Sequence, residues 1–318
     1  MEFFFHILLN NIVPVFTLIL VGFGLGRKFD LDVFTLSKLN FYVFVPSFIL
    51  VSLYTTDIPW EMLSVIAFTV LLLGLSFGIS TVVGRLRGHS TGLSSAFKNS
   101  VMFYNSGNIG LPLITLVFSN PPFEGAGVLS LVVTAQIMVL VIQNITTNTF
   151  GIYNAGRATL RWQQSLVTVL KMPTIYAIPT ALLFKVLPVD LARAPFWPAL
   201  EHARGGLIAV ALVTLGVQLS RTKIRVTNHE VYWAAALRLL VGPAMAWALL
   251  HVLGLQGALA QALLISSAVP TSVNSALIAV EMGNHSGFAS QVVMVSTLFS
   301  ALTLTLVIFT AQMLFPVF

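Results

Sequence analysis

Long apolar runs recur along the whole chain, and each run is bounded by charged residues, glycine or proline. A membrane-spanning helix needs about 20 consecutive apolar residues. Runs of at least this length lie at 6–26, 33–54, 60–84, 92–119, 124–149, 165–187, 197–219, 230–253, 257–282 and 286–315. Only 8% of the residues are charged, against about 25% in soluble domains. The sequence therefore predicts an all-α integral membrane protein with ten transmembrane helices.

Basic residues are distributed unevenly between the two ends of these predicted helices. One end carries the larger set: Arg27, Lys28, Arg85, Arg87, Lys98, Arg157, Arg161, Lys171, Arg221, Lys223 and Arg225. The other end carries Lys185, Arg193 and Arg204. Because the cytoplasmic loops of membrane proteins are enriched in Lys and Arg, we expect a multi-pass protein of the cytoplasmic (inner) membrane with both termini outside.

The even number of predicted helices suggests how the chain is divided. Residues 1–154 hold five of them and residues 155–318 hold the other five. Since five is odd, the two halves must enter the membrane in opposite directions, which defines an inverted repeat. Short internal similarities support this division. Asn105-Ser-Gly-Asn108 aligns with Thr271-Ser-Val-Asn274, and residues 130–136 resemble residues 290–296.

Predicted helices four and nine contain polar segments at corresponding places, Asn105-Ser-Gly-Asn-Ile-Gly-Leu-Pro112 and Val269-Pro-Thr-Ser-Val-Asn-Ser-Ala276. Proline removes a backbone donor and glycine weakens a helical turn. We therefore expect both helices to be broken, and the residues expected at the interruptions are Gly107, Gly110, Pro112 and Pro270. In helix four the interruption is expected at 105–108 rather than at the proline itself. Paired interruptions in two halves of a chain point to a binding site near the membrane midplane.

A broken helix exposes backbone N–H groups at the start of its second half, and the helix dipole makes that end electropositive. Two such ends facing each other form an anion site without a charged side chain. The side chains expected to bind the ligand are Asn105, Asn108, Gln136, Thr271, Ser272, Asn274 and Ser296. Neither segment contains an acidic residue, which favours a carboxylate over a cation. A structural hydrogen bond between helices is the alternative for Gln136, and a bond within its own helix is the alternative for Ser296.

These polar segments resemble those of a known family. Asn105-Ser-Gly-Asn-Ile-Gly-Leu-Pro-Leu113 is similar to the fourth-helix signature of the auxin efflux carrier family of bacterial and plant transporters. Further matching stretches are Leu215-Gly-Val-Gln-Leu219, Arg238-Leu-Leu-Val-Gly-Pro243, Ala268-Val-Pro-Thr271 and Val295-Ser-Thr-Leu-Phe-Ser300. The resemblance covers most of the chain. It departs at Tyr104, where plant members have a proline, whereas Pro270 keeps the corresponding proline of helix nine.

The resemblance implies that helices four and nine cross at the midplane of a 5+5 inverted repeat, an arrangement more distantly similar to that of bile acid–sodium symporters. It also implies a scaffold of helices 1, 2, 6 and 7 and a transport domain of helices 3–5 and 8–10 that moves by an elevator-like step. Plant relatives are dimeric and export auxin, and bacterial relatives are associated with malonate- or malate-type acids. By analogy, the resemblance implies a homodimer and an organic-anion substrate.

One charged residue, Arg238, falls well inside a predicted helix. Charged side chains at membrane depth are functional candidates, although a long Arg side chain can also extend to the membrane surface. We therefore expect Arg238 to reach the cytoplasmic side or, alternatively, to attract substrate or contact another domain.

The residues give no support to other kinds of chemistry. The chain has no cysteine, its six histidines lack metal-ligand spacing, and there is no nucleotide-binding or catalytic motif. We expect no catalytic residues, no metal and no cofactor. The net charge of +6 is spread over short loops, which disfavours nucleic acid. The predicted function is a carrier of small organic anions across the lipid bilayer, secondary active or facilitative. The alternatives are a sodium-coupled organic-anion symporter, a channel and an intramembrane enzyme.

Overall fold

The structure is a computed structural model that describes residues 5, 7–56, 59–120, 123, 126–156, 173–187, 190–222 and 228–317. Every named element in these residues is a helix. Seven helical segments in this part of the chain are long and apolar enough to cross a membrane. They are Leu8–Lys28, Val33–Thr55, Met62–Leu86, Gly127–Ala155, Trp197–Ser220, His229–Val252 and Ser286–Leu314. The expectation of an all-helical integral membrane protein is confirmed.

Shorter apolar helices accompany these seven segments, at Ser106–Phe118, Tyr176–Val186 and Gly257–Ser267. In chain order the elements are η1 (Leu8–Ile12), α2 (Val13–Lys28), α3 (Val33–Leu39), η2 (Asn40–Phe44), α4 (Val45–Thr55), α5 (Met62–Leu86), α6 (Thr91–Met102), η3 (Ser106–Gly110), α7 (Leu111–Phe118), α8 (Ala126–Thr146), η4 (Thr147–Gly151), α9 (Ile152–Ala155), α11 (Pro173–Val186), η5 (Leu191–Arg193), α12 (Trp197–Ser220), α13 (His229–Ala236), η6 (Leu237–Val241), α14 (Gly242–Val252), α15 (Gly257–Ser267), α16 (Val273–Glu281) and α17 (Ser286–Leu314). Of the η elements, η5 is a 3₁₀ turn and the others are π-helical turns.

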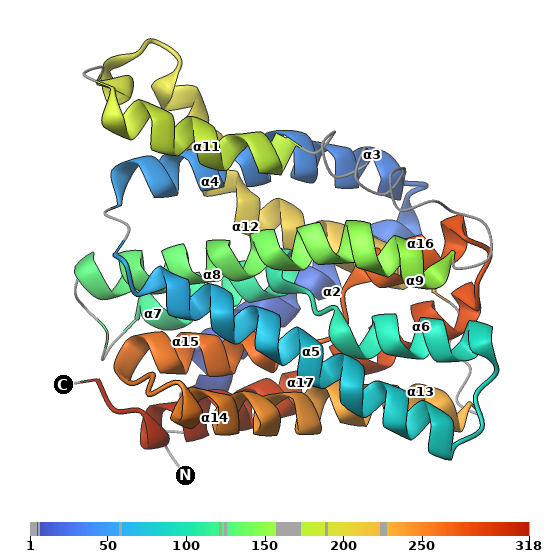
Figure 1. Ribbon diagram of the computed structural model, residues 1–318. Coiled ribbons are helices and arrows are strands. Elements are labelled where there is room, and N and C mark those ends of the chain that lie inside the picture. Colours follow the sequence, from blue (N-terminus) through green and yellow to red (C-terminus); the bar gives the residue numbers. More distant parts are fainter. Residues whose placement is uncertain are drawn as a thin grey trace.

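Most helices run in nearly the same direction across Figure 1 and stack in layers. In that view α3, α4 and α11 form the upper layer, α14, α15 and α17 lie at the bottom, and α5 and α8 lie between them. The most extensive helix pair is α2 with α12, and α4 packs on both α11 and α12. In the other part of the bundle, α15 packs on α8 and α17, and α16 packs on α17.

Glycines let α2 and α12 approach each other closely. A Cβ atom on Gly216 would collide with the Ile19 carbonyl oxygen, and one on Gly22 would collide with the Val213 carbonyl oxygen. Because lipid supplies no hydrophobic drive between helices, small residues stabilise membrane helix pairs by allowing close van der Waals contact. The glycines therefore bind α2 and α12 into one unit.

Four of the π-helical turns end two residues before a proline. The pairs are η1 with Pro14, η2 with Pro46, η3 with Pro112 and η6 with Pro243. Proline has no N–H for the carbonyl four residues earlier, and its ring crowds that carbonyl. A π turn bonds one residue further back and widens the helix at this point. Each of these prolines is therefore accommodated inside a continuous helical segment.

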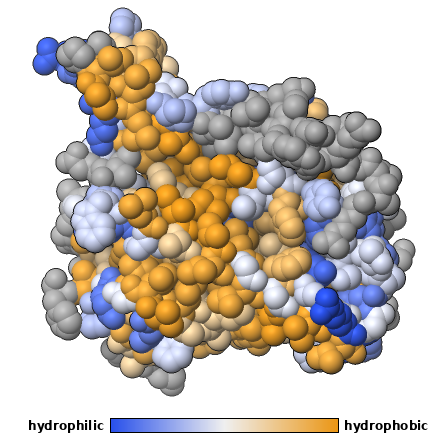
Figure 2. All heavy atoms as spheres, viewed as in Figure 1, coloured by the Kyte–Doolittle hydropathy of each residue, from blue (hydrophilic) through white to orange (hydrophobic). Residues whose placement is uncertain are grey.

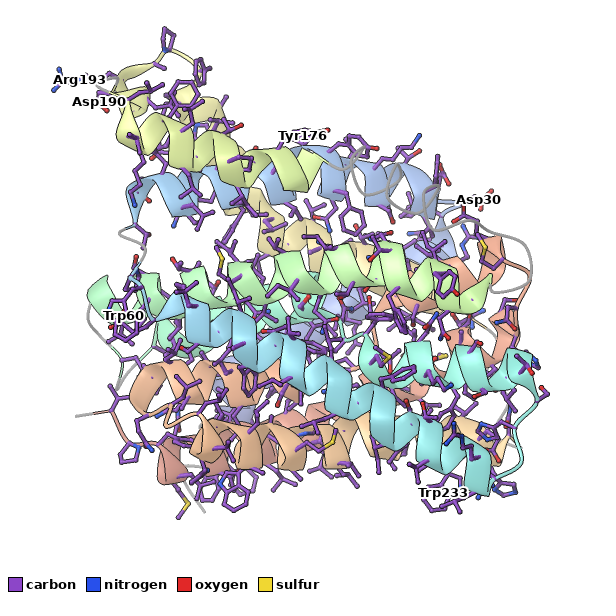
Figure 3. The ribbon with its side chains drawn as sticks, viewed as in Figure 1. Asp30, Trp60, Tyr176, Asp190, Arg193 and Trp233 are labelled. Atoms are coloured by element: carbon purple, nitrogen blue, oxygen red, sulfur yellow. The ribbon has the colours of Figure 1, made fainter. Side chains whose placement is uncertain are left out.

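Hydrophobic residues cover the middle of the bundle face drawn in Figure 2. Figure 2 shows them across the centre of this face, with hydrophilic residues toward the left and right edges. Trp60, Asp190 and Arg193 lie at the left end of the bundle, whereas Asp30 and Trp233 lie at the right end (Figure 3). An apolar belt with tryptophans at both ends is typical of a protein in a bilayer.

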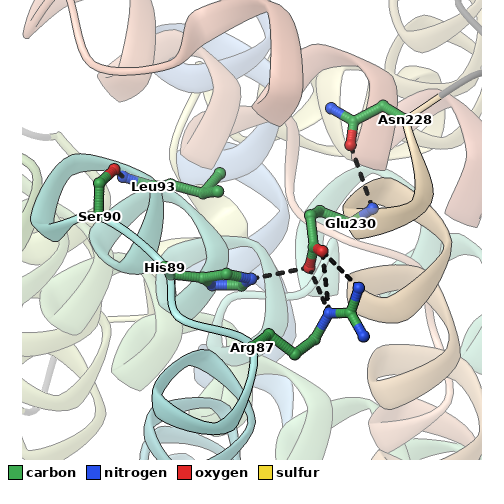
Figure 4. Close-up of polar contacts among 6 residues, drawn as sticks. All are labelled: Arg87, His89, Ser90, Leu93, Asn228 and Glu230. Carbon is green, nitrogen blue, oxygen red and sulfur yellow. Dashed lines mark hydrogen bonds and ion pairs between the residues drawn. The ribbon is translucent and has the colours of Figure 1, made fainter.

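A charged cluster joins the connection between α5 and α6 to the start of α13 (Figure 4). The Arg87 Nη2 lies 2.6 Å from the Glu230 Oε1, and the His89 Nε2 lies 2.7 Å from the Glu230 Oε2. The hydrogen bonds to Glu230 raise the pKa of the Arg87 guanidinium above its ordinary value. Of the basic residues expected on the same side as Arg87, several lie outside the described residues: Arg157, Arg161, Lys171, Lys223 and Arg225.

Candidate functional site

Two helices end at neighbouring places inside the bundle. α6 ends at Met102 and the next helical residue is Ser106. α15 ends at Ser267 and the next helix begins at Val273. The two non-helical stretches, residues 103–105 and 268–272, are called the junction below.

Backbone hydrogen bonds hold the two non-helical stretches of the junction side by side. Tyr104 and Thr271 form an antiparallel bridge. The N–H of Asn105 donates to the Pro270 carbonyl, and the N–H of Ser272 donates to the carbonyl of residue 103, both at 2.8 Å. These bonds satisfy backbone groups that lipid could not satisfy. The junction therefore places the starts of η3 and α16 next to each other.

Both of these helix starts carry a side-chain cap. The Asn105 Oδ1 accepts a hydrogen bond from the Asn108 N–H at 3.1 Å. The Ser272 Oγ accepts one from the Asn274 N–H at 3.3 Å. A helix start has unsatisfied N–H groups and roughly half a positive elementary charge. Two such charges therefore lie close together in the interior of the bundle.

A narrow pocket of about 20 Å³ opens beside the two helix starts. Its polar lining residues are Asn105, Ser106, Asn108, Gln143, Asn144, Thr147, Ser272 and Asn274. The others are Phe41, Tyr104, Gly107, Leu140 and Val273. All of these lining residues are uncharged, so the helix starts are the positive groups of the pocket lining.

The Asn105 side chain has one hydrogen-bonding atom to spare. Its Oδ1 caps η3, but its Nδ2 has no partner in the described part of the chain. Asn105 is only 5% exposed, and a buried donor without a partner costs about 1–3 kcal/mol. A ligand oxygen in the pocket would satisfy this donor.

Four of the residues predicted to bind a ligand line the pocket, namely Asn105, Asn108, Ser272 and Asn274. Sequence reasoning did not select the three polar residues contributed by α8 and η4, which are Gln143, Asn144 and Thr147. Their spacing places them on one face of the helix. Polar residues at this spacing in an otherwise apolar helix are the signal that could have identified them.

The other three predicted residues, Gln136, Thr271 and Ser296, are not among the lining residues of the pocket. They form hydrogen bonds with backbone groups instead. The Gln136 Nε2 donates to the Ser106 carbonyl at 2.8 Å. The Ser296 Oγ accepts from the Thr271 N–H at 3.2 Å. The Thr271 Oγ1 donates to the Ser100 carbonyl at 2.8 Å. For Gln136 this is the structural alternative that the sequence left open.

The residues expected at the helix interruptions lie in two different settings. Pro270 is in the junction, whereas Gly107, Gly110 and Pro112 lie within the helical segment Ser106–Phe118. The non-helical residues of this chain segment are thus 103–105, slightly earlier than expected, because the Asn105 side chain starts a new helix by capping it. Gly110 has a packing role, since a Cβ atom there would lie 2.6 Å from the Gln136 Nε2.

Arg238 lies beside the junction and not at the membrane surface. Its side chain is completely buried, and its guanidinium donates to the carbonyls of Val101 and Ser267. The expectation that it reaches the cytoplasmic side is wrong, because both acceptors are carbonyls at helix ends in the interior. The alternatives, that Arg238 attracts substrate or contacts another domain, stay predictions.

The chemistry available at the junction is that of neutral hydrogen-bonding groups and helix dipoles. In the described part of the chain, no group of three or more His, Cys, Asp or Glu residues could hold a metal ion. Capped helix starts and a spare amide donor suit an anion.

Comparison with known proteins gives the family. The profile described as membrane transport protein matches residues 7–308. The chain is 23% identical over 304 residues to an uncharacterized transporter of Methanothermobacter thermautotrophicus, and the match covers 93% of this chain and 96% of the relative. Because the profile match spans nearly the whole chain, the protein belongs to the membrane transport protein family, that of the auxin efflux carriers, and is a transporter.

Proposed function

We propose that this transporter is a carrier of small organic anions, chiefly carboxylates, across the cytoplasmic membrane. The observation that carries the proposal is that two capped helix starts meet at one uncharged pocket. Each start contributes roughly half a positive elementary charge, so the pair roughly matches one carboxylate. The Asn105 Nδ2 adds a donor that has no partner in the described chain.

The pocket is narrow in this structure. Its volume of about 20 Å³ is close to that needed for a single water molecule, roughly 10–15 Å³, and far below the range of about 300–1,000 Å³ for small-molecule sites. The proposal therefore requires the pocket to widen when a mono- or dicarboxylate of a few carbon atoms binds.

The proposed architecture around the pocket is a 5+5 inverted repeat of ten helices. In it, α6 and η3–α7 are the two parts of a broken helix four, and α15 and α16 are the two parts of a broken helix nine. Their antiparallel contact at Tyr104 and Thr271 supports this assignment, because inverted repeats bring their broken helices together at one central site. The end of the bundle with Trp60 and Arg193 would face outside together with both termini, and the end with Arg87 would face the cytoplasm.

The proposed transport step is a sliding movement of α5–α9 and α13–α17 along α2–α4, α11 and α12. Phe41 is the one residue of the described pocket lining that belongs to the second group. The first group would thus carry nearly the whole pocket with it. The Asn40 Nδ2 donates to the Asn108 Oδ1 at 3.0 Å across this boundary, so the movement must exchange this hydrogen bond.

Uptake by purified protein in liposomes tests the proposal with labelled mono- and dicarboxylates. The expected result is saturable uptake that Asn274→Ala reduces strongly, because this side chain lines the pocket. Asn11→Ala is the matched control, since Asn11 is a buried amide in η1 outside the pocket lining.

Three outcomes would change the proposal. Absence of uptake of every tested acid by folded protein would contradict an organic-anion carrier. Single-channel currents in a bilayer would show a channel in place of a carrier. A strict requirement for sodium would show a symporter.

A further inference from the structure

The guanidinium of Arg238 joins the C-terminal ends of the two helices that stop at the junction. Its Nη1 donates at 3.1 Å to the carbonyl of Val101, one residue before the end of α6. Its Nη2 donates to the carbonyl of Ser267, the last residue of α15. Carbonyls in the last turn of a helix have no partner within that helix. One side chain therefore satisfies acceptors from both helix ends.

The surroundings of Arg238 balance its charge without a carboxylate. The residue is 0% exposed and lies in the transmembrane segment His229–Val252. No ion pair joins it to an acidic residue in the described ranges. A buried cation is costly unless it is compensated. Each helix C-terminal end carries roughly half a negative elementary charge, so the ends of α6 and α15 together roughly balance one guanidinium.

Neighbouring residues leave a space shaped for the guanidinium. A Cβ atom on Gly242 would lie 2.7 Å from the Arg238 Nη2, so only glycine leaves this room. The Arg238 Cζ also lies 4.8 Å from the centre of the Tyr104 ring, within the range of a cation–π contact. Tyr104 in turn lines the pocket. The guanidinium thus lies at the negative C-terminal ends of α6 and α15, and the pocket lies at the positive starts of η3 and α16.

We propose that Arg238 is a built-in cation that takes the place of a coupling cation at the junction. In transporters with broken helices, half-helix C-terminal ends and unwound carbonyls bind Na⁺. In this chain such groups are bonded to a fixed guanidinium, so uptake of the substrate needs no sodium ion. Arg238 is also a positioning residue, because it fixes the two helix ends from which the junction leads to the caps Asn105 and Ser272. The sodium-independent uptake rests on the proposed carrier function, whereas the positioning role does not.

The charge requirement can be tested by replacing the fixed guanidinium with a soluble one. Arg238→Ala leaves a buried space beside the two helix ends and is expected to lower the thermal unfolding temperature of the purified protein. Guanidinium chloride at about 10 mM, far below the molar concentrations that denature proteins, is expected to restore several degrees in this variant and none in the wild type. Urea, which has a similar shape but no charge, is expected to restore none. Equal rescue by urea and guanidinium would overturn the proposal.

A second variant keeps the test valid if Arg238→Ala does not fold. Gly242→Ala displaces the guanidinium without removing its charge. It is expected to lower both the unfolding temperature and uptake relative to Gly205→Ala, whose added methyl group meets nothing within 4 Å. Wild-type behaviour of Gly242→Ala would overturn the positioning role.

The cation requirement of uptake is measured on the wild type, in liposomes with Na⁺, K⁺ or N-methylglucamine as the main cation. The expected rates agree within a factor of about two, which is less than 0.5 kcal/mol by the tenfold-per-1.4 kcal/mol rule. A tenfold loss without Na⁺ would overturn the proposal. The thermal readout uses no substrate and so separates the two ideas. Rescue by guanidinium without any carboxylate uptake would remove the carrier assignment and leave the role of Arg238 intact. Carboxylate uptake without rescue by guanidinium would leave the carrier assignment intact and remove the role of Arg238.

Discussion

Asn105 has two separable tasks, and substitutions can test them one at a time. Its Oδ1 caps the helix that begins at Ser106, and its Nδ2 is buried without a partner in the described chain. Asn105→Ala removes both groups. Loss of the cap is expected to lower the free energy of unfolding by about 1 kcal/mol. Loss of a donor to a charged carboxylate costs binding a further 1.5–3 kcal/mol or so, which corresponds to roughly 10- to 150-fold in affinity.

Asn105→Asp keeps the capping oxygen and removes the donor. Aspartate caps a helix as well as asparagine does, but the position is only 5% exposed, so burial of the new charge costs stability. The new carboxylate oxygen replaces the donor and repels an anionic substrate. Binding and uptake are therefore expected to fall at least as far as in Asn105→Ala.

Both quantities are measured on the same purified samples. Denaturant titration gives the free energy of unfolding, and the rise in unfolding temperature with added carboxylate gives the affinity. Asn11→Ala is the control, because Asn11 and Asn105 are both 5% exposed. The reasoning is refuted if Asn105→Asp binds and transports as the wild type does, or if Asn11→Ala loses as much affinity as Asn105→Ala.

Three further predictions concern the packing around the site. Gly110→Ala is expected to push the Gln136 amide off the Ser106 carbonyl. This change lowers stability by about 1–3 kcal/mol and reduces uptake. Gly127→Ala is the control in the same uptake assay, because its added methyl group meets nothing within 4 Å. Gly216→Ala is expected to separate α2 from α12 and to lower the unfolding temperature, whereas Gly205→Ala on the same helix leaves it unchanged; equal unfolding temperatures would contradict the close contact. Glu230→Gln removes the carboxylate that Arg87 and His89 contact, and because the Arg87 and Glu230 side chains are partly exposed the loss of stability is expected to be small. That loss should shrink in high salt, as denaturant titration at two ionic strengths would show.

Much of the helical framework follows from local patterns. Apolar runs long enough to span a bilayer predict helices, because backbone polar groups in lipid must be satisfied within the segment. The segments around Asn105 and Thr271 stand out from their apolar surroundings for the same reason. In the structure both segments lie at the junction, and four of the selected residues line one pocket.

Other features depend on contacts that no local pattern specifies. Thr271 and Ser296 carry a side-chain hydroxyl as Ser272 does, yet only Ser272 is among the lining residues of the pocket. Gln143 is as polar as Gln136, yet only Gln143 lines the pocket. Which polar side chain faces the pocket depends on the rotation of each helix against its neighbours, and the sequence of one helix does not specify that rotation.

The sequence by itself determined that this chain is a helical membrane protein with the motifs of a transporter family, because hydropathy and helix-weakening residues act within one segment. The tertiary structure alone decided that Arg238 belongs to the junction. Its side chain is long enough to reach either the membrane surface or the interior. It lies in the interior because the carbonyls of Val101 and Ser267, at two helix ends, accept its hydrogen bonds. These carbonyls come together only when the bundle is packed. A charge can stay buried only where such compensating dipoles converge, and that convergence is a property of the fold.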